Sequence, residues 1–282
     1  MNPSLRARVA VLHLLVLALS FGDAADAASM RFGKRTLEIS APLDFVPIAA
    51  SAPRRLQMMQ AYLPQTSRLA EVYTRPAAAA QLKRDDRINL DRYFEVQVAR
   101  KQEGVPASSR IIAASNAEIH AQLRKLMGSA DRVVADLAQR GNAELKRTTA
   151  QDPGVSLNNM RYVHIYRHEP WGVFLTMKGR LDVDGQSEDV VGSYAMLAVN
   201  FQLIDLYAFS QLHGEADMRW TESALSDWAD AVHRANPDDP AIAATVVKQW
   251  TPEDFGRIGQ ILGGAVGVGA TLLWGVYRKR KR

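Results

Sequence analysis

Hydrophobic residues recur at two spacings along the chain, and each spacing predicts a kind of element. Alternation is cleanest where Phe94, Val96 and Val98 share one face and Glu95 and Gln97 share the other, which is typical of a strand. Similar patterns predict further extended runs. Together with the run around Phe94, the predicted strands cover residues 36–40, 45–48, 69–74, 92–100, 162–168, 173–183, 190–199 and 202–210.

The four runs between residues 161 and 212 follow one another with short connections. Asp184-Gly185 is a favourable pair for the tight turn of a hairpin. Parallel neighbours would need a crossover helix between them. This part of the chain therefore predicts an antiparallel meander.

Helical spacing appears in three places. The first is residues 54–62, which Pro64 follows closely. The second begins at residues 115–118, Ser-Asn-Ala-Glu, a capping box whose serine and glutamate each satisfy a free backbone amide. In the third, Asp217 can cap a helix that ends at Asn236-Pro237. It repeats an apolar residue every four positions, at Trp220, Ala224, Trp228 and Val232.

The order of these elements predicts an α+β fold, mainly an antiparallel sheet flanked by helices, in one domain over residues 28–240. Residues 77–86, rich in alanine and polar side chains, are predicted to be a connector. The order over residues 34–236 resembles the PsbP-like fold. Three segments carry this resemblance: residues 37–42, residues 203–209 and the helix around Trp220 and Trp228. It implies an accessory factor that helps membrane complexes assemble or work, and it brings no metal-contacting residue to this chain.

The N-terminus has the pattern of a secretory signal. Arg6 and Arg8 precede an apolar run over residues 9–21, and Ala25-Asp26-Ala27 places small residues where a signal peptidase cuts. We therefore predict a signal peptide over residues 1–27. An uncleaved N-terminal anchor is the alternative, although the run is short for a membrane span.

The C-terminus has the pattern of a membrane anchor. Residues 258–277 carry no charge, and at ~1.5 Å per helical residue they reach ~30 Å, the thickness of the hydrocarbon core. We predict a single transmembrane helix there, reached through a tether over residues 241–257. The chain then ends in a basic cytoplasmic tail: Arg278, Lys279, Arg280, Lys281 and Arg282. This topology places the main domain in the periplasm, at the inner membrane.

Two features of the predicted span leave alternatives open. Gly263-Gly264, followed by apolar residues and a basic cluster, also suits a sorting tail that a membrane protease removes, which would release the protein. In addition, small residues recur every four positions, which favours self-association or binding to a partner transmembrane helix. They are Gly259, Gly263, Gly267, Thr271 and Gly275. Against this, glycine is simply common in spans.

The net charge of +5 resides in the basic tail, so the exported domain is formally neutral. A neutral domain has no cationic excess for phosphates, which argues against a nucleic-acid partner. The tail instead suits the anionic headgroups of membrane lipid. The chain has no cysteine, which excludes thiol catalysis, disulfides and thiolate metal sites.

No residue pattern specifies a metal or a cofactor. His164 and His168 would share a strand face but lie roughly 13 Å apart, too far for one metal. Four acidic residues surround Gly185 without the spacing of a calcium loop, so a solvated turn explains them better. They are Asp182, Asp184, Glu188 and Asp189.

Catalytic and ligand-binding patterns are equally weak. Asp205, Asp217 and His213 could meet a serine in the fold, but no serine lies in a Gly-x-Ser-x-Gly elbow. The larger aromatic residues indicate a core rather than a ligand platform: Trp171, Tyr194, Tyr207, Phe209, Trp220 and Trp228. The sequence thus predicts a membrane-tethered binding, assembly or scaffolding module. An exported hydrolase whose site only the fold assembles is the alternative.

Overall fold

The computed structural model describes residues 28–84, 90–107, 155–183 and 186–239, with residues 135, 139–143, 146–147 and 242. A mainly antiparallel sheet with a few helices confirms the predicted α+β class. The predicted signal peptide, the capping box at residues 115–118 and the predicted span over residues 258–277 lie outside the described residues.

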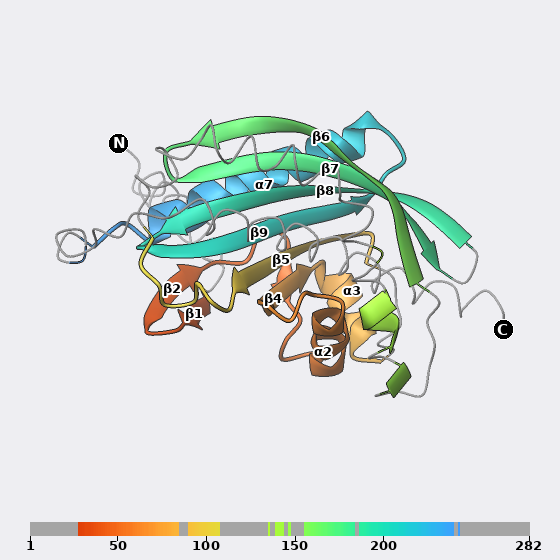
Figure 1. Ribbon diagram of the computed structural model, residues 1–282, viewed down its shortest axis with the longest axis horizontal. Coiled ribbons are helices and arrows are strands. Elements are labelled where there is room, and N and C mark those ends of the chain that lie inside the picture. Colours follow the sequence, from red (N-terminus) through yellow and green to blue (C-terminus); the bar gives the residue numbers. More distant parts are fainter. Residues whose placement is uncertain are drawn as a thin grey trace, which may run out of the picture.

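Seven strands form the main sheet, and every neighbouring pair is antiparallel (Figure 1). In spatial order they are β3 (Val46–Pro47), β4 (Ser67–Thr74), β5 (Arg92–Ala99), β9 (Gln202–Gln211), β8 (Gln186–Val199), β7 (Gly172–Val183) and β6 (Val155–Glu169). Strands β6 to β9 neighbour one another in chain order, which confirms the predicted meander. The pairing of β7 with β8 reaches Val183 and Gln186, as a two-residue hairpin requires.

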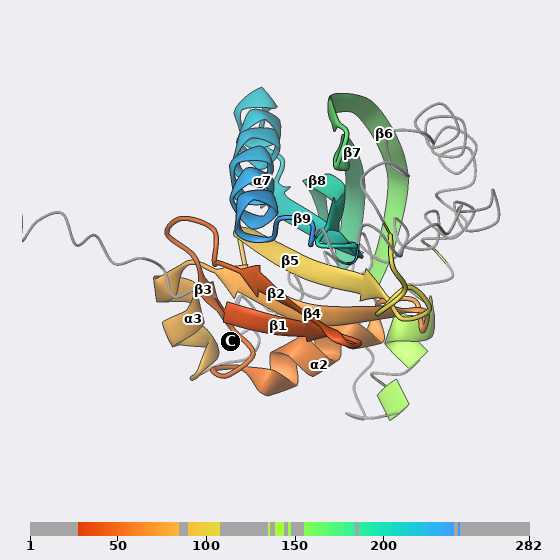
Figure 2. The same ribbon diagram turned by 90° about the vertical axis from the view of Figure 1, so that its left-hand side faces the viewer.

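Strand β6 bends along its length (Figures 1 and 2). Its pairing with β7 is interrupted by three register shifts between residues 158 and 167. An extra residue in one strand of a pair bends that strand and increases its twist. Simple alternation between two faces therefore does not hold between His164 and His168.

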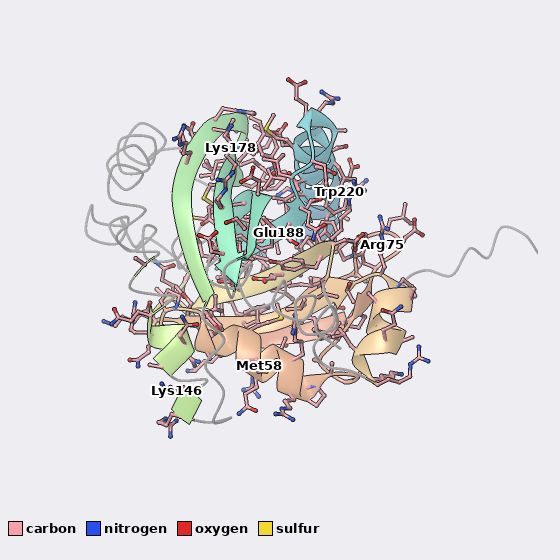
Figure 3. All side chains as sticks on the ribbon, turned by 90° about the vertical axis from the view of Figure 1, so that its right-hand side faces the viewer. Met58, Arg75, Lys146, Lys178, Glu188 and Trp220 are labelled. Atoms are coloured by element: carbon pink, nitrogen blue, oxygen red, sulfur yellow. The ribbon has the colours of Figure 1, made fainter. Side chains whose placement is uncertain are left out.

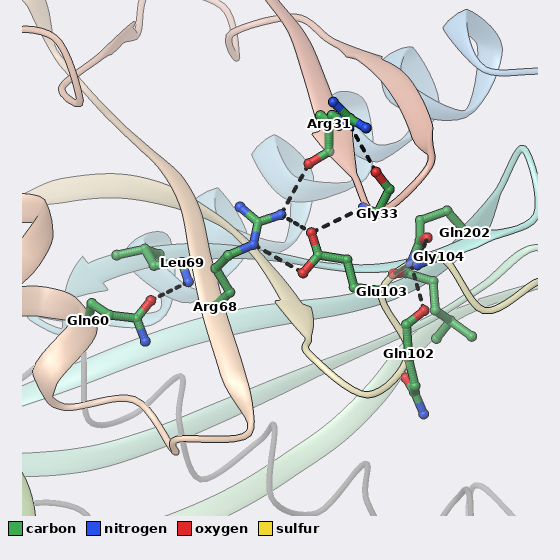
Figure 4. A network of polar contacts seen from close by, with 10 residues as sticks. Arg31, Gly33, Gln60, Arg68, Leu69, Gln102, Glu103, Gly104 and Gln202 are labelled. Carbon is green, nitrogen blue, oxygen red and sulfur yellow. Dashed lines mark hydrogen bonds and ion pairs between the residues drawn. The ribbon is translucent and has the colours of Figure 1, made fainter.

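A second, two-stranded sheet consists of β1 (Ala28–Phe32) and β2 (Arg35–Ile39). Figure 4 shows how it is fastened: Arg68 pairs with Glu103 at 2.6 Å and also donates to the Arg31 carbonyl at 3.2 Å. Glu103 accepts the Gly33 amide at 3.2 Å. At Gly33 φ is +60°, and an added Cβ would lie 2.8 Å from the Gly104 Cα, so only glycine fits this turn.

Three helices longer than one turn are described: α2 (Pro53–Ala61), α3 (Pro76–Leu82) and α7 (Glu215–Ala235). The predicted connector over residues 77–86 was wrong in its first half, because α3 starts with Pro76 at N1 and continues through alanines, both favourable in a helix. The predicted cap of α7 was also wrong. Gly214 is the N-cap residue, and Asp217 lies in the first turn, where its carboxylate accepts the His213 amide at 2.9 Å.

The helices cover opposite faces of the main sheet (Figure 2). Helix α7 and the β1–β2 hairpin pack on one face, which we call the α7 face, against buried Phe94, Val96 and Val98 of β5. Helix α2 packs on the other face, the α2 face, where Tyr194 and Tyr207 are also buried. The predicted alternation of β5 is confirmed, but both of its faces lie inside the protein.

Candidate functional site

A groove of about 510 Å³ opens on the α7 face. One wall is the loop over residues 41–45, another is α7 from Trp220 to Ala231, and Arg75, just before α3, also lines the groove. Figure 3 shows Trp220 on α7 and Arg75 beneath it on the same side of the molecule. With Phe94 of β5, the groove thus brings together four segments that are far apart in the sequence.

The loop wall is a tight turn that presents an apolar side chain to solvent. The Phe45 amide donates to the Pro42 carbonyl at 3.0 Å, and Asp44 has φ of 62°. A positive φ is uncommon outside glycine, and Asp is among the residues that tolerate it. Leu43, between Pro42 and Asp44, is 88% exposed. Among the described residues it is the only large hydrophobic side chain that is exposed. The turn therefore holds Leu43 out at the rim of the groove.

Aromatic rings form the floor of the groove. Phe94 contacts Phe45 at 4.7 Å, Trp228 at 5.3 Å and Trp220 at 5.6 Å between ring centroids, each close to edge to face. Edge-to-face contact is a favourable arrangement for aromatic rings. Trp228 also donates from Nε1 to the Ser40 carbonyl at 2.8 Å, which ties α7 to the chain just before the loop. These contacts pack the loop and α7 against β5.

The two arginines of this region are already engaged. Arg92 lies over the Trp220 ring at 4.4 Å and pairs with Asp217 at 3.1 Å. The His213 amide and then Arg92 lower the pKa of Asp217. Arg75 pairs with Asp91 at 3.6 Å, with both side chains about half exposed.

Two carboxylates line the groove without such partners. Asp44 on the loop and Asp227 on α7 are both exposed. Within the described part of the chain, neither forms an ion pair or a side-chain hydrogen bond. The groove therefore combines an aromatic floor, an exposed leucine and two available negative charges.

A second polar cluster lies inside the α2 face. Glu95, Gln97 and Asp205 are at most 2% exposed; Gln97 donates to Glu95 at 2.7 Å, and the Tyr194 hydroxyl donates to Asp205 at 2.7 Å. Burial raises the pKa of Glu95 well above its ordinary value and that of Asp205 to about 7. Since substrate cannot reach these groups, we assign them to the core.

A third polar chain joins the sheet to α7. His164 meets Glu222 at 3.1 Å, Thr176 donates to Glu222 at 2.7 Å, and Ser193 donates to Thr221 at 2.9 Å. A hydrolase needs its nucleophilic hydroxyl bonded to the histidine base. Here Thr176 bonds to the carboxylate instead, and Ser193 is fully buried. These groups therefore do not form the hydroxyl and histidine pair of a serine hydrolase.

The residues that the sequence suggested for chemistry are dispersed. His213 lies 3.6 Å from Asp217 at the start of α7, whereas Asp205 is buried in β9 against Tyr194. No group of three or more His, Asp or Glu side chains among the described residues is arranged to hold a metal.

The acidic residues near the predicted hairpin turn are engaged with polar neighbours. Asp182 accepts from Ser187, Glu188 from Gln211 at 3.0 Å and Asp189 from Arg180 at 2.9 Å. Asp184 lies outside the described residues. A hairpin surface therefore accounts for three of the four.

The aromatic set divides in two. Tyr194, Tyr207, Phe209 and Trp228 are core residues, as predicted, whereas Trp171 and Trp220 are only partly buried. Sequence reasoning missed the groove residues Leu43, Asp44, Phe45, Arg75 and Asp227. The one available signal was two apolar residues, Leu43 and Phe45, just after Pro42.

The predicted association stripe, Gly259 to Gly275, and the basic residues 278–282 lie outside the described residues. Among the residues that the structure does describe, no helix is both long enough and hydrophobic enough to span a membrane. Compared with known proteins, the chain matches no protein-family model and has no significant match among curated proteins.

Proposed function

We propose that the protein is a binding module at the cytoplasmic membrane, and that the groove on the α7 face holds a segment of a partner protein. The domain would be exported by residues 1–27 and anchored by residues 258–277, with the basic tail against anionic lipid. The resemblance to accessory factors points the same way.

One observation carries the proposal: Leu43 is 88% exposed at the rim of a groove with an aromatic floor. A single exposed leucine is common on protein surfaces, but Leu43 adjoins a groove with an aromatic floor, so a partner segment in the groove would cover both. Concave sites lined by aromatic side chains and a few polar groups are typical of ligand binding. Binding accounts for both features together.

The alternative, an exported hydrolase, receives less support from the described residues. The hydroxyl, histidine and carboxylate groups that come together between the sheet and α7 do so in an order that leaves the hydroxyl without a histidine base. We therefore place recognition, rather than bond cleavage, at the accessible site.

The test is a peptide-display selection against the full-length chain in detergent, with a variant that blocks the groove. Leu43→Ser with Ala224→Gln removes the exposed leucine and adds bulk to the helix wall. The matched control, Ala50→Ser with Ser223→Gln, makes similar changes at exposed positions that do not line the groove.

We expect the selected peptides to bind wild type and the control alike, and to bind the blocked variant at least tenfold more weakly. Peptides that bind all three proteins equally would place recognition elsewhere and overturn the proposal. Both variants keep the aromatic floor, so circular dichroism should confirm that each is folded.

The membrane placement has its own test. Protease added to spheroplasts should digest the domain from outside, and Gly263→Ile with Gly267→Ile should weaken association of the span in a membrane association assay. Protection of the domain from protease would contradict the predicted topology.

A further inference from the structure

We infer that the groove recognises a cationic, apolar peptide segment, in which a lysine or arginine lies next to a leucine, phenylalanine or similar side chain. This inference rests on the proposed function, because it names the chemistry of the ligand for that same groove.

The first observation is the charge of the residues that line the groove. Three charged residues line it: Asp44, Asp227 and Arg75. Arg75 is already paired with Asp91, whereas the two carboxylates have no ion-pair partner within the described residues. The available charge is therefore negative, and a ligand that brings a cation gains from it. An anionic headgroup or a phosphate would be repelled.

The second observation is the position of the two carboxylates in the groove. Asp44 lies on the loop and Asp227 on α7, so the negative charges come from both walls. Asp227 follows Trp220 by seven residues and therefore lies on the same side of the helix, two turns further on. A cation that enters between the walls would meet a carboxylate and an aromatic surface together.

The same region already contains one example of this recognition. The Arg92 guanidinium covers the Trp220 ring at 4.4 Å while Asp217 holds it at 3.1 Å. Cations are attracted to the faces of indole rings, more strongly where water is partly excluded. A ligand cation near Asp227 would repeat the arrangement from the groove side.

The apolar part of the ligand follows from the floor and the rim. Phe45, Phe94 and Leu43 offer an apolar surface that a cation alone would leave uncovered. Two exposed carboxylates hold a small hydrated ion weakly, since water competes for it. A peptide segment supplies the charge and the apolar side chain in one chain, so we commit to a protein partner.

The experiment measures binding of labelled synthetic peptides to the full-length chain by fluorescence anisotropy. In the probe series, a leucine or phenylalanine is followed by lysine, glutamine or glutamate in a glycine and serine background. We expect the lysine peptides to bind roughly three- to tenfold more tightly than the glutamine peptides, and the glutamate peptides to bind weakest. Added salt should weaken only the first group.

The variant that tests the carboxylates is Asp44→Asn with Asp227→Asn. Asparagine tolerates the positive φ of residue 44, so the turn is kept. We expect this variant to lose the preference for lysine. The control, Glu215→Gln with Asp239→Asn, removes the same charge from exposed residues outside the groove and should retain the preference.

The possible failures are distinguishable. If all three peptide classes bind wild type equally and the blocked groove variant binds none, the groove is a binding site and the inference about charge is overturned. If the Asp44→Asn and Asp227→Asn variant still prefers lysine, the inference is likewise overturned. If no peptide binds, or if the peptides bind the blocked variant as tightly as wild type, the proposed function itself fails.

Discussion

The two faces of the main sheet use similar residue types for different purposes. On the α7 face, aromatic rings pack edge to face and the carboxylates lie at the edge of the groove, where Asp44 and Asp227 reach solvent. On the α2 face, Glu95 and Asp205 lie among tyrosines, at most 2% exposed. Burial, not residue type, separates the available acids from the structural ones.

This difference shows where binding should be sought. A buried carboxyl has a raised pKa and a fixed hydrogen bond, so it contributes to folding and to its pH dependence. An exposed carboxylate beside an aromatic floor keeps its charge available to a partner. Changes to buried groups should therefore alter stability, whereas changes to the exposed groups of the groove should alter binding.

The largest expected effect comes from the core of the α7 face. Trp228→Ala removes a 3% exposed indole that contacts Tyr73 and Phe94 and donates to the Ser40 carbonyl. We expect the free energy of unfolding in urea to fall by about 3–5 kcal/mol. Trp220→Ala, on the same helix but partly exposed, should cost clearly less. Equal losses would show that Trp220 is as much a core residue as Trp228.

The acids of the α2 face should make stability depend on pH. The pKa of Asp205 is about 7 in the folded protein against an ordinary value of 3.8, so the folded state binds more protons between these values. Stability should therefore fall as pH rises through this range, by up to ~1.4 kcal/mol per unit from Asp205, and Glu95, whose pKa burial also raises, should add to the fall.

Asp205→Asn removes this titration while it keeps an acceptor for the Tyr194 hydroxyl. Its new amide faces Gln97, which lies directly across on β5 and whose Oε1 has no hydrogen bond among the described residues. At pH 8 we expect the variant to be more stable than wild type by about 2–4 kcal/mol, with little difference near pH 4. Parallel stability curves for the two proteins would contradict a buried titrating Asp205.

Local patterns predicted the sheet well because most of its neighbouring strands are consecutive in the sequence, with β5 and β9 as the exception. Alternation in β5 and the short connections from β6 to β9 were enough for the meander. The same patterns could not show that Glu95 and Gln97 are buried, because that depends on what covers the second face. Helix α3 could have been predicted, since Pro76 and the alanines after it favour a helix start.

The groove could not have been predicted from spacing. Its walls come from residues 41–45, Arg75 and α7, which only tertiary packing brings together. The four-residue spacing that includes Trp220 and Trp228 indicated one buried face. Because the α-helix has 3.6 residues per turn, residues at this spacing shift gradually around the helix. Trp228 is therefore core and Trp220 lies at the edge.

A smaller effect is expected where α7 ends. Asn236, 5% exposed, accepts the Glu38 amide and donates to the Glu38 carbonyl, both at 2.8 Å, and it also donates to the Val232 carbonyl. It thus pairs with β2 as a neighbouring strand would. Asn236→Ala should lower the free energy of unfolding by about 1–3 kcal/mol, because it leaves the Glu38 groups unpaired. Thermal unfolding measures this loss, and a loss below that of an exposed control such as Ser223→Ala would contradict the anchoring role.

The smallest effect on stability, and the sharpest separation of the two roles, is expected at Leu43. Leu43→Ser changes a side chain that is 88% exposed, so the free energy of unfolding should stay within about 0.5 kcal/mol of wild type. Binding of the selected peptides should nevertheless fall severalfold, because the apolar rim of the groove is lost. Urea unfolding and peptide anisotropy on the same preparation measure both quantities. A loss of stability without a loss of binding would place Leu43 in the structure rather than in the site, and would reverse the contrast between the groove and the core.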